Sequence, residues 1–183
     1  ELNHPNIRQP LWKKLYRVDS YKKSIKDGIA LDIGLKILVG GATGILYNEL
    51  VEKKKEFSMV GGFYQGLARE SGYVYLYAIP IKDMDIKEIN EKIVQEIGLA
   101  IDKKITLELL NIEKKKYFFN SVFGMDGILK PAEIIGEALT LGLNLNDIEF
   151  WNDNLKKIDL EVVKKVLRKF AANENFVLGG LKN

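Results

Sequence analysis

Histidine and cysteine bind metals or act as nucleophiles in many enzymes, and this chain of 183 residues contains one His, His4, and no Cys. These counts exclude disulfides, thiol nucleophiles, Cys-ligated zinc or iron–sulfur centres, and any site that needs two His ligands. A Ser-His-Asp triad would have to use His4, which lies close to the start of the chain. We therefore expect no catalytic or metal-binding site built on Cys or on a pair of His in this chain.

A glycine-rich stretch, Gly40-Gly41-Ala42-Thr43-Gly44, could place backbone N–H groups around a phosphate. It lacks the Gly-Lys-Ser/Thr ending of a Walker loop and follows a predicted helix instead of a strand. We interpret it as a helix-to-helix turn, and Gly61-Gly62 as a bulge or a close backbone approach.

Carboxylates that converge could bind Mg²⁺ or act as general acid and base. The candidates are Asp83, Asp85, Asp147, Glu149 and Asp153. None has a spacing that demands such chemistry, and we predict helix caps or solvated side chains. An unrelated Asp/Glu and Mg²⁺ enzyme stays open as a third reading, which would require several of these carboxylates to meet in one pocket.

The charge is nearly balanced, with 28 basic and 25 acidic residues and a formal net charge of +3. This balance predicts neither a nucleic-acid nor a membrane-surface partner. Lysine-rich runs at 53–55, 114–116 and 164–169 lie on predicted helices. A nucleic-acid surface would expose aromatic residues between the cations. Because the nearby aromatic residues lie on the apolar side of these helices, we interpret the lysines as part of a solvated surface. No apolar stretch reaches the roughly 18 to 20 residues of a membrane span.

The pattern of elements predicts an α+β fold with a mostly antiparallel sheet and helices layered on one face. Residues 1–10 read as an entry arm or linker, and residues 11–183 as one α+β domain. Predicted strands span 11–20, 57–65, 72–80 and 176–178; the strand at 72–80 is apolar or aromatic throughout, so we expect both of its faces to be at least partly covered.

Helices are predicted by apolar periodicity and by capping residues. The first two span 27–39, buried on most sides, and 43–55. The next begins in a capping box at Asp85 and extends to about 101, and another runs from Thr106 to about 123 with an apolar stripe that includes Phe118 and Val122. Further helices are expected at 131–141, ended by Gly142, and after N-caps at Asn146 and Asp159.

The order of several segments resembles one family. The segments that carry the resemblance are residues 5–10, Leu15-Tyr16, residues 37–52, the helix from Asp85, Thr106 to Leu110, the helix end at 136–142, Trp151 and residues 158–163. Together these are similar to the C-terminal half of pitrilysin/insulinase-type zinc metallopeptidases, in the bacterial branch akin to the mitochondrial processing peptidase.

The resemblance implies two related α+β domains of the metallohydrolase type that close on each other around a polypeptide substrate. In this family the N-terminal domain holds zinc through His-x-x-Glu-His and a further Glu. This sequence contains no such motif. The resemblance therefore implies that the chain is the half that binds no metal, and that zinc belongs to a partner domain outside this sequence.

Many relatives place an Arg and a Tyr, seven residues apart, after the glycine-rich turn of the metal-free half, where they reach across to the substrate. By the resemblance, the matching positions here are Val51 and Ser58. Valine has no hydrogen-bond donor, and serine lacks the reach of a phenol. We predict that this chain does not supply the pair.

The resulting hypothesis is a catalytically silent C-terminal domain of a zinc endopeptidase, inactive alone, which encloses polypeptide against a zinc-bearing domain in the same or a separate chain. The alternative is a stand-alone interaction or scaffold domain that kept the fold without activity. A homodimer remains open. The start lacks an initiator Met and a leader pattern, so we expect a processed chain or an excised fragment; the bacterial relatives would place the parent in the periplasm or cell envelope.

Overall fold

The computed structural model describes residues 1–124, 126–127 and 129–182. Its sheet has five strands in the order β1-β5-β2-β4-β3. They are β1 (Leu2–Asn3), β2 (Leu11–Asp19), β3 (Phe57–Gln65), β4 (Ser71–Pro80) and β5 (Phe176–Lys182). Only the short β1–β5 pair is parallel; β2, β3, β4 and β5 pair antiparallel. The helices are α1 (Ile25–Val39), α2 (Ile45–Tyr47), α3 (Ile86–Leu99), α4 (Leu107–Gly124), α5 (Leu129–Thr140), α6 (Leu145–Glu149), α7 (Trp151–Lys156) and α8 (Leu160–Ala171).

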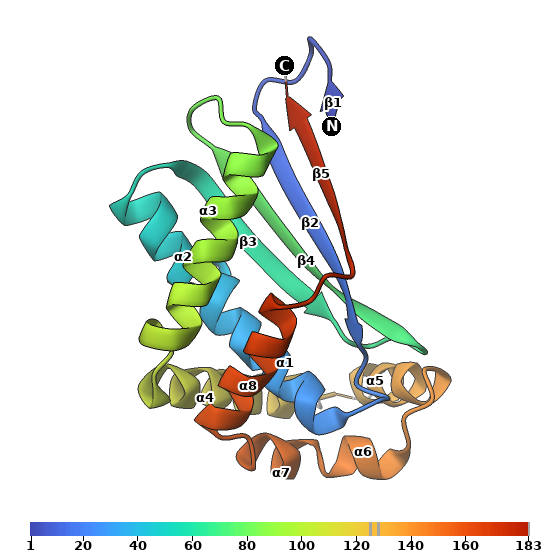
Figure 1. Cartoon of the computed structure of the whole chain (residues 1–183). Helices are drawn as coiled ribbons and strands as arrows, with labels where there is room; N and C mark the ends of the chain where they lie inside the picture. Colours follow the sequence, from blue (N-terminus) through green and yellow to red (C-terminus); the bar gives the residue numbers. More distant parts are fainter. Residues whose placement is uncertain (125, 128, 183) are drawn as a thin grey trace.

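One face of the sheet lies under α1, α3 and α8 (Figure 1). The alternation of β4 explains why, because Val74, Leu76 and Ala78 are all buried on this face. The predicted α+β fold with helices on one face is confirmed. The expectation that both faces of β4 are at least partly covered is met at Tyr75 and Tyr77, which are partly buried, but not at Tyr73, which is exposed.

Helix α1 lies at the centre of the molecule and is buried on most sides, as predicted. Ser24 caps it by accepting a hydrogen bond from the N–H of Asp27 at 3.2 Å. Gly34 allows α8 to come close, because a Cβ at Gly34 would lie 2.8 Å from Cγ of Leu167. The contact between α1 and α8 therefore depends on a residue without a side chain.

The predicted helix at 43–55 is instead three short pieces: a 3₁₀ turn at Gly41–Thr43, α2, and a π-helical turn at Asn48–Lys53. Gly41 has φ +75°, a left-handed conformation that favours glycine. The glycine-rich stretch is thus a helix-to-helix turn, as predicted.

A buried carboxylate holds this region against α3. Glu96 is 2% exposed and accepts from Lys54 at 2.6 Å and from Lys104 at 2.5 Å. Lys104 also pairs with Glu49 of the π-helical turn at 3.2 Å. Burial would raise the pKa of Glu96, but the two lysine hydrogen bonds outweigh burial and hold this pKa below its ordinary value.

At Gly61-Gly62 the structure shows the second of the two predicted alternatives, and the last strand is longer than predicted. The irregularity in β3 lies between Phe57 and Met59, not at the glycines; Gly62 is a close backbone approach, because a Cβ there would lie 2.5 Å from the carbonyl oxygen of Tyr75. The last strand runs to Lys182 instead of ending at 178. Its Gly180 lies beneath α3, where a Cβ would meet Ile86 Cδ1 at 2.5 Å.

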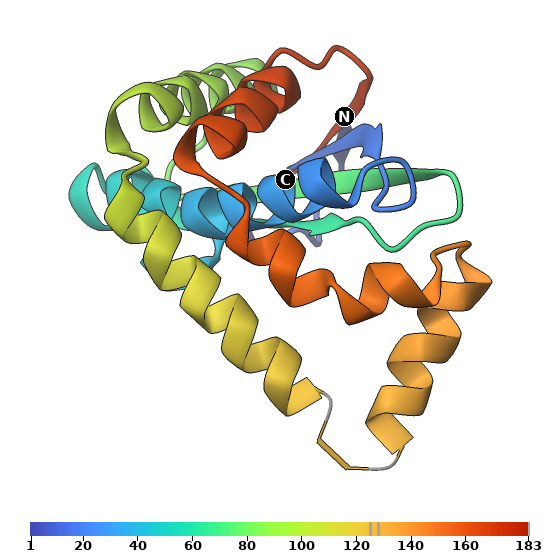
Figure 2. The same cartoon turned by 90° about the horizontal axis from the view of Figure 1, so that it is seen from below.

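Helices α4 to α7 extend past the uncovered side of the sheet (Figure 2). The predicted apolar stripe of α4 is confirmed at Leu110, which is buried, and at Tyr117, which packs against the core, but it is wrong at Phe118 and Val122, which are exposed. These helices are joined through Lys114, whose Nζ donates to the carbonyl oxygens of Lys156 and Ile158, each at 2.9 Å.

Caps at three helix starts agree with the prediction in part. Asp85 caps α3, but by accepting from the N–H of Ile86 and not in the predicted capping box with Glu88; Asp159 caps α8 by accepting from the N–H of Val162. The predicted cap at Asn146 is wrong: Asn144 caps α6 in a reciprocal capping box with Asp147. Over the ranges that the structure covers, no helix has the length and apolar character needed to cross a membrane.

Candidate functional site: the uncovered face of the sheet

His4, Val51 and Ser58, the residues that the sequence analysis singled out, make local structural contacts. His4 is exposed and its Nδ1 accepts a hydrogen bond from the N–H of Asn6 at 3.3 Å. Val51 is half-buried and packs against the core, and the exposed Ser58 donates its hydroxyl to the carbonyl oxygen of Ile79 at 3.2 Å. The side chain of Val51 has no hydrogen-bond donor, and the hydroxyl of Ser58 is shorter than a phenol and bonds to the backbone of β4.

The acidic candidates do not converge either. Asp85 and Asp147 serve at helix starts, and Asp153 pairs with Lys156 at 3.0 Å. Among residues 1–124, 126–127 and 129–182, no group of three or more His, Asp or Glu side chains could hold a metal ion. The structure therefore gives no support to an Asp/Glu and Mg²⁺ centre in this part of the chain.

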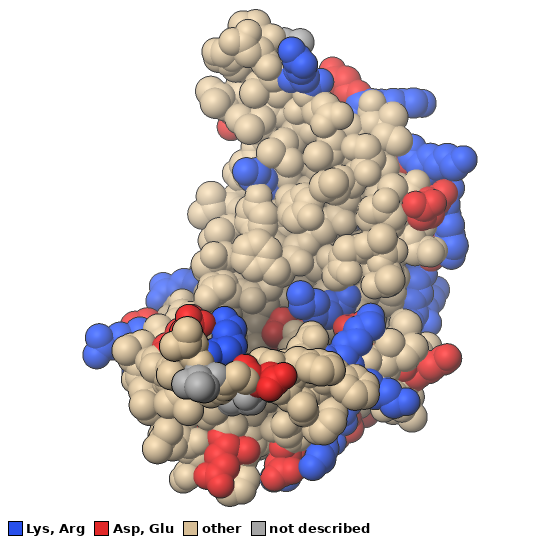
Figure 3. Space-filling view, turned by 180° about the vertical axis from the view of Figure 1, so that it is seen from behind, with Lys and Arg blue, Asp and Glu red and all other residues tan. Residues whose placement is uncertain are grey.

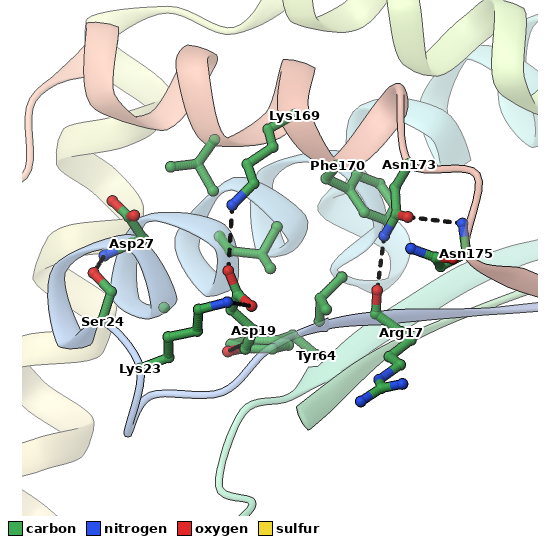
Figure 4. A pocket seen from close by; sticks show the side chains of 14 residues that line it. Arg17, Asp19, Lys23, Ser24, Asp27, Tyr64, Lys169, Phe170, Asn173 and Asn175 are labelled. Carbon is green, nitrogen blue, oxygen red and sulfur yellow. Dashed lines mark hydrogen bonds and ion pairs between the residues drawn. The ribbon is translucent and has the colours of Figure 1, made fainter. Parts of the chain in front are cut away.

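A polar pocket of about 380 Å³ lies between the end of β2, the start of α1 and the end of α8 (Figure 4). Asp19 pairs there with Lys23 at 2.7 Å and with Lys169 at 3.2 Å. Tyr64 donates to the carbonyl oxygen of Asp19 at 2.6 Å, and the side-chain amide of Asn173 donates to that of Arg17 at 2.7 Å. Because these groups bond to one another, the pocket joins three elements and has the character of a structural junction.

The face of the sheet opposite the helices is the most distinctive surface. We call it the open face, and its central row crosses four strands as Val177, Leu15, Tyr75 and Phe63. A solvated face of an antiparallel sheet is normally polar, yet Val177 is 69% exposed and Phe63 41%. Figure 3 shows this face as a broad surface with few charged side chains.

Aromatic rings fill the open face in contact with one another. The ring of Phe63 lies 5.4 Å from that of Tyr75 and 6.1 Å from that of Tyr73, and Tyr75 lies 5.9 Å from Tyr77. Tyr77 lies across Gly61, where any side chain would collide with the phenol. Such a surface favours close contact with another body, because aromatic side chains bury large areas at little cost in conformational freedom.

The cations on this face lie beside the rings. Lys13 Nζ is 5.9 Å from the centre of the Tyr75 ring, and Arg17 Nε donates to Ser71 Oγ at 2.9 Å. The sequence did contain the signal for this surface, since tyrosines at 73, 75 and 77 alternate with buried aliphatic residues. Sequence reasoning missed it because both faces of this run were expected to be at least partly covered.

The fold is that of peptidase domains. A protease from Helicobacter pylori superposes with a TM-score of 0.85 at 17% identity; the alignment covers 100% of this chain and 43% of that one. The inactive peptidase domain of a proposed zinc protease from Bordetella parapertussis superposes with a TM-score of 0.82 at 21% identity, covering 98% and 92% of the two chains. A peptidase M16 inactive domain from Pseudomonas fluorescens gives 0.76 at 17% identity, covering 99% and 42%. This chain therefore spans less than half of the Helicobacter and Pseudomonas chains.

The family follows from the sequence itself. The model of the peptidase M16 inactive domain matches residues 4–117, which is more than half of the chain. The chain belongs to the peptidase M16 inactive-domain family, as the sequence resemblance predicted. No curated protein sequence matches it.

Proposed function

We propose that this chain is the catalytically silent half of a zinc endopeptidase, which packs its open face toward a zinc-bearing domain and encloses polypeptide between the two. The observation that supports this most directly is the open face itself. Its central row is apolar or aromatic on four adjacent strands, whereas the solvent-facing side of an antiparallel sheet normally carries polar side chains. The zinc would belong to the partner domain, and none to this chain.

The membership of an inactive-domain family supports the silent role. The packing at Val51 and the backbone hydrogen bond of Ser58 support the view that this chain does not supply the Arg and Tyr of its relatives. The domain would then act by shape and contact alone: it would hold polypeptide near a metal that another domain binds.

Metal analysis and peptidase assays of the isolated chain form the first test. We expect no stoichiometric zinc and no cleavage of an unfolded protein. One tightly bound zinc per chain, or cleavage that a chelator abolishes, would overturn the proposal.

A second test asks whether the open face meets the zinc-bearing domain. The purified zinc-bearing domain of the same protease is titrated with this chain and with two variants that make the same change, Phe63→Asp on the open face and Phe119→Asp on α4. Both phenylalanines are exposed, at 41% and 56%. We expect Phe63→Asp to weaken association by about tenfold or more, because a buried unpaired carboxylate replaces an apolar contact, and Phe119→Asp to leave it unchanged.

Two results favour the alternative of a stand-alone interaction domain. One is association with a protein that has no zinc motif. The other is a gene that encodes this chain without any His-x-x-Glu-His domain. Equal effects of both variants would refute the specific role of the open face.

A further inference from the structure

A hollow of about 250 Å³ lies beside the loop from β3 to β4, among the helices that extend past the open face. Its apolar lining is Leu67, Ile134, Ala138, Leu143, Ile148 and Trp151. Figure 3 shows the surface hollowed where the open face meets these helices. For comparison, an engineered protein cavity of about 150 Å³ binds benzene. The hollow can therefore admit a phenylalanine or leucine side chain together with some of its backbone.

The rim of the hollow is polar and acidic. Glu137 and Asp147 contribute to its lining, and Ser121 Oγ donates to Asn152 Oδ1 at 2.8 Å on the α4 side. One carboxylate oxygen of Asp147 accepts from the N–H of Asn144, yet the charge remains. An apolar floor with a charged rim selects a ligand with an apolar group next to a group of opposite charge.

The chain segment that supplies α5 and α6 carries a charge opposite to that of the chain as a whole. Residues 126–155 contain six acidic residues and one lysine, a formal net charge of −5 in a chain of +3. Among its described residues, the same segment exposes four large apolar side chains. They are Leu129, Leu139, Leu145 and Phe150. A surface that is apolar and acidic attracts cationic, apolar partners and repels anionic ones, with a range that salt shortens.

We propose that this hollow binds a large apolar side chain of a polypeptide segment that also contains lysine or arginine. The proposal rests on the proposed function, because it names the class of polypeptide that the domain would help to enclose. A second copy of this chain fits the surface less well, since two copies that met through residues 126–155 would bring two charges of −5 together. Anionic lipid is disfavoured for the same reason.

The test measures fluorescence anisotropy of a labelled linear peptide of phenylalanine, lysine and serine with the isolated chain. Two companion peptides replace every lysine by glutamate, or every phenylalanine by serine. We expect the first peptide to bind about tenfold or more tightly than either companion. Its affinity should fall as sodium chloride is raised from low to physiological concentration. Equal binding of all three peptides, or none, would overturn the proposal.

Gly124 provides a variant that fills the hollow. It lines the hollow at the end of α4, and a Cβ there would meet Ile134 Cδ1 at an ordinary 3.7 Å. Gly124→Leu should weaken binding of the Phe-Lys peptide by about tenfold. Gly136→Leu is the matched control, because Gly136 lies on α5 outside the lining and faces open space; it should bind as the parent does. Circular dichroism checks that both variants are folded.

The charge is tested separately, so that a folding defect in one variant does not decide the outcome. Glu137→Lys should weaken binding several-fold at low salt, whereas Glu91→Lys on the exposed side of α3 makes the same change in net charge away from the hollow and should have a smaller effect. Equal effects of these two variants would show that net charge alone acts, and would overturn the assigned site.

The same variants separate this proposal from the proposed function. If Gly124→Leu abolishes association with the zinc-bearing domain, or abolishes a dimer seen by light scattering, the occupant is that domain or a second copy and the peptide proposal is wrong. If the chain associates with the zinc-bearing domain through its open face but binds no peptide, the proposed function stands and this inference fails. If peptide binds in the hollow while no zinc-bearing domain associates, the proposed function fails instead.

Discussion

The close contact of α1 with α8 can be tested with the pair Gly34 and Leu167. A Cβ at Gly34 would lie 2.8 to 2.9 Å from Cγ and both methyl carbons of Leu167, and Leu167 has no exposed surface into which it could move. In a helix interior alanine is about 1 kcal/mol more favourable than glycine, but overpacking costs about 1 to 3 kcal/mol. With about 2 kcal/mol for the clash, Gly34→Ala should lower the free energy of unfolding by about 1 kcal/mol.

Removal of the leucine reverses the sign of the alanine effect. Leu167→Ala alone should cost about 3 kcal/mol, since it leaves a cavity in the core. In the double variant the clash is absent and the helix preference of alanine remains, so this variant should be about 1 kcal/mol more stable than Leu167→Ala. The two substitutions would then be coupled by about 2 kcal/mol, far beyond the additivity of independent sites.

Urea unfolding followed by far-ultraviolet circular dichroism measures the four free energies, with constant m-values as the check for two-state behaviour. Gly98→Ala in α3 is the matched control, because a Cβ there would meet nothing within 4 Å; it should stabilise by up to about 1 kcal/mol in both backgrounds. If Gly34→Ala also stabilises by about that amount with Leu167 present, the argument for close helix packing is refuted.

Three further variants test other features, each by urea unfolding. Glu96→Gln removes the charge that binds Lys54 and Lys104; because both lysines are partly exposed, we expect a loss of about 1 to 2 kcal/mol at neutral pH. Because the pKa of Glu96 is lower in the folded state than the unfolded value of about 4.3, its ionisation stabilises the fold above that value, and this stabilisation is lost as the pH falls through the folded pKa. The Glu96→Gln variant should therefore lose less stability on acidification than the parent. Parallel pH profiles of stability for the two proteins would contradict this. Asp159→Ala should cost about 1 kcal/mol by removing the cap of α8, and an unchanged midpoint would argue against that cap. Gly142→Ala should cost about 1 to 2 kcal/mol, because φ is +89° there, and a stabilised variant would contradict the strain.

Sequence reasoning succeeded where local chemistry decides the structure. Periodicity and capping residues placed α1, α3 and α8, and Gly142 ended α5 as predicted. It failed where long-range contacts decide. The π-helical turn at Asn48–Lys53 adjoins ion pairs with α3. Strand β5 continues through Gly180, where Ile86 of α3 occupies the space that a side chain would need. Neither contact is visible within a short window of sequence.

The candidate site shows a deeper limit of the same kind. Periodicity identified the apolar residues of both β4 and α4, but it assumed that each would be covered within this chain. Tyr73 on the open face and Phe118 on α4 are exposed instead. Burial of an exposed apolar face against a partner surface is thermodynamically favourable, but the sequence pattern that predicts such a face does not identify the partner. For a family of domains that occur as parts of longer chains, the exposed residues that the fold leaves over are thus the positions at which experiments on function should begin.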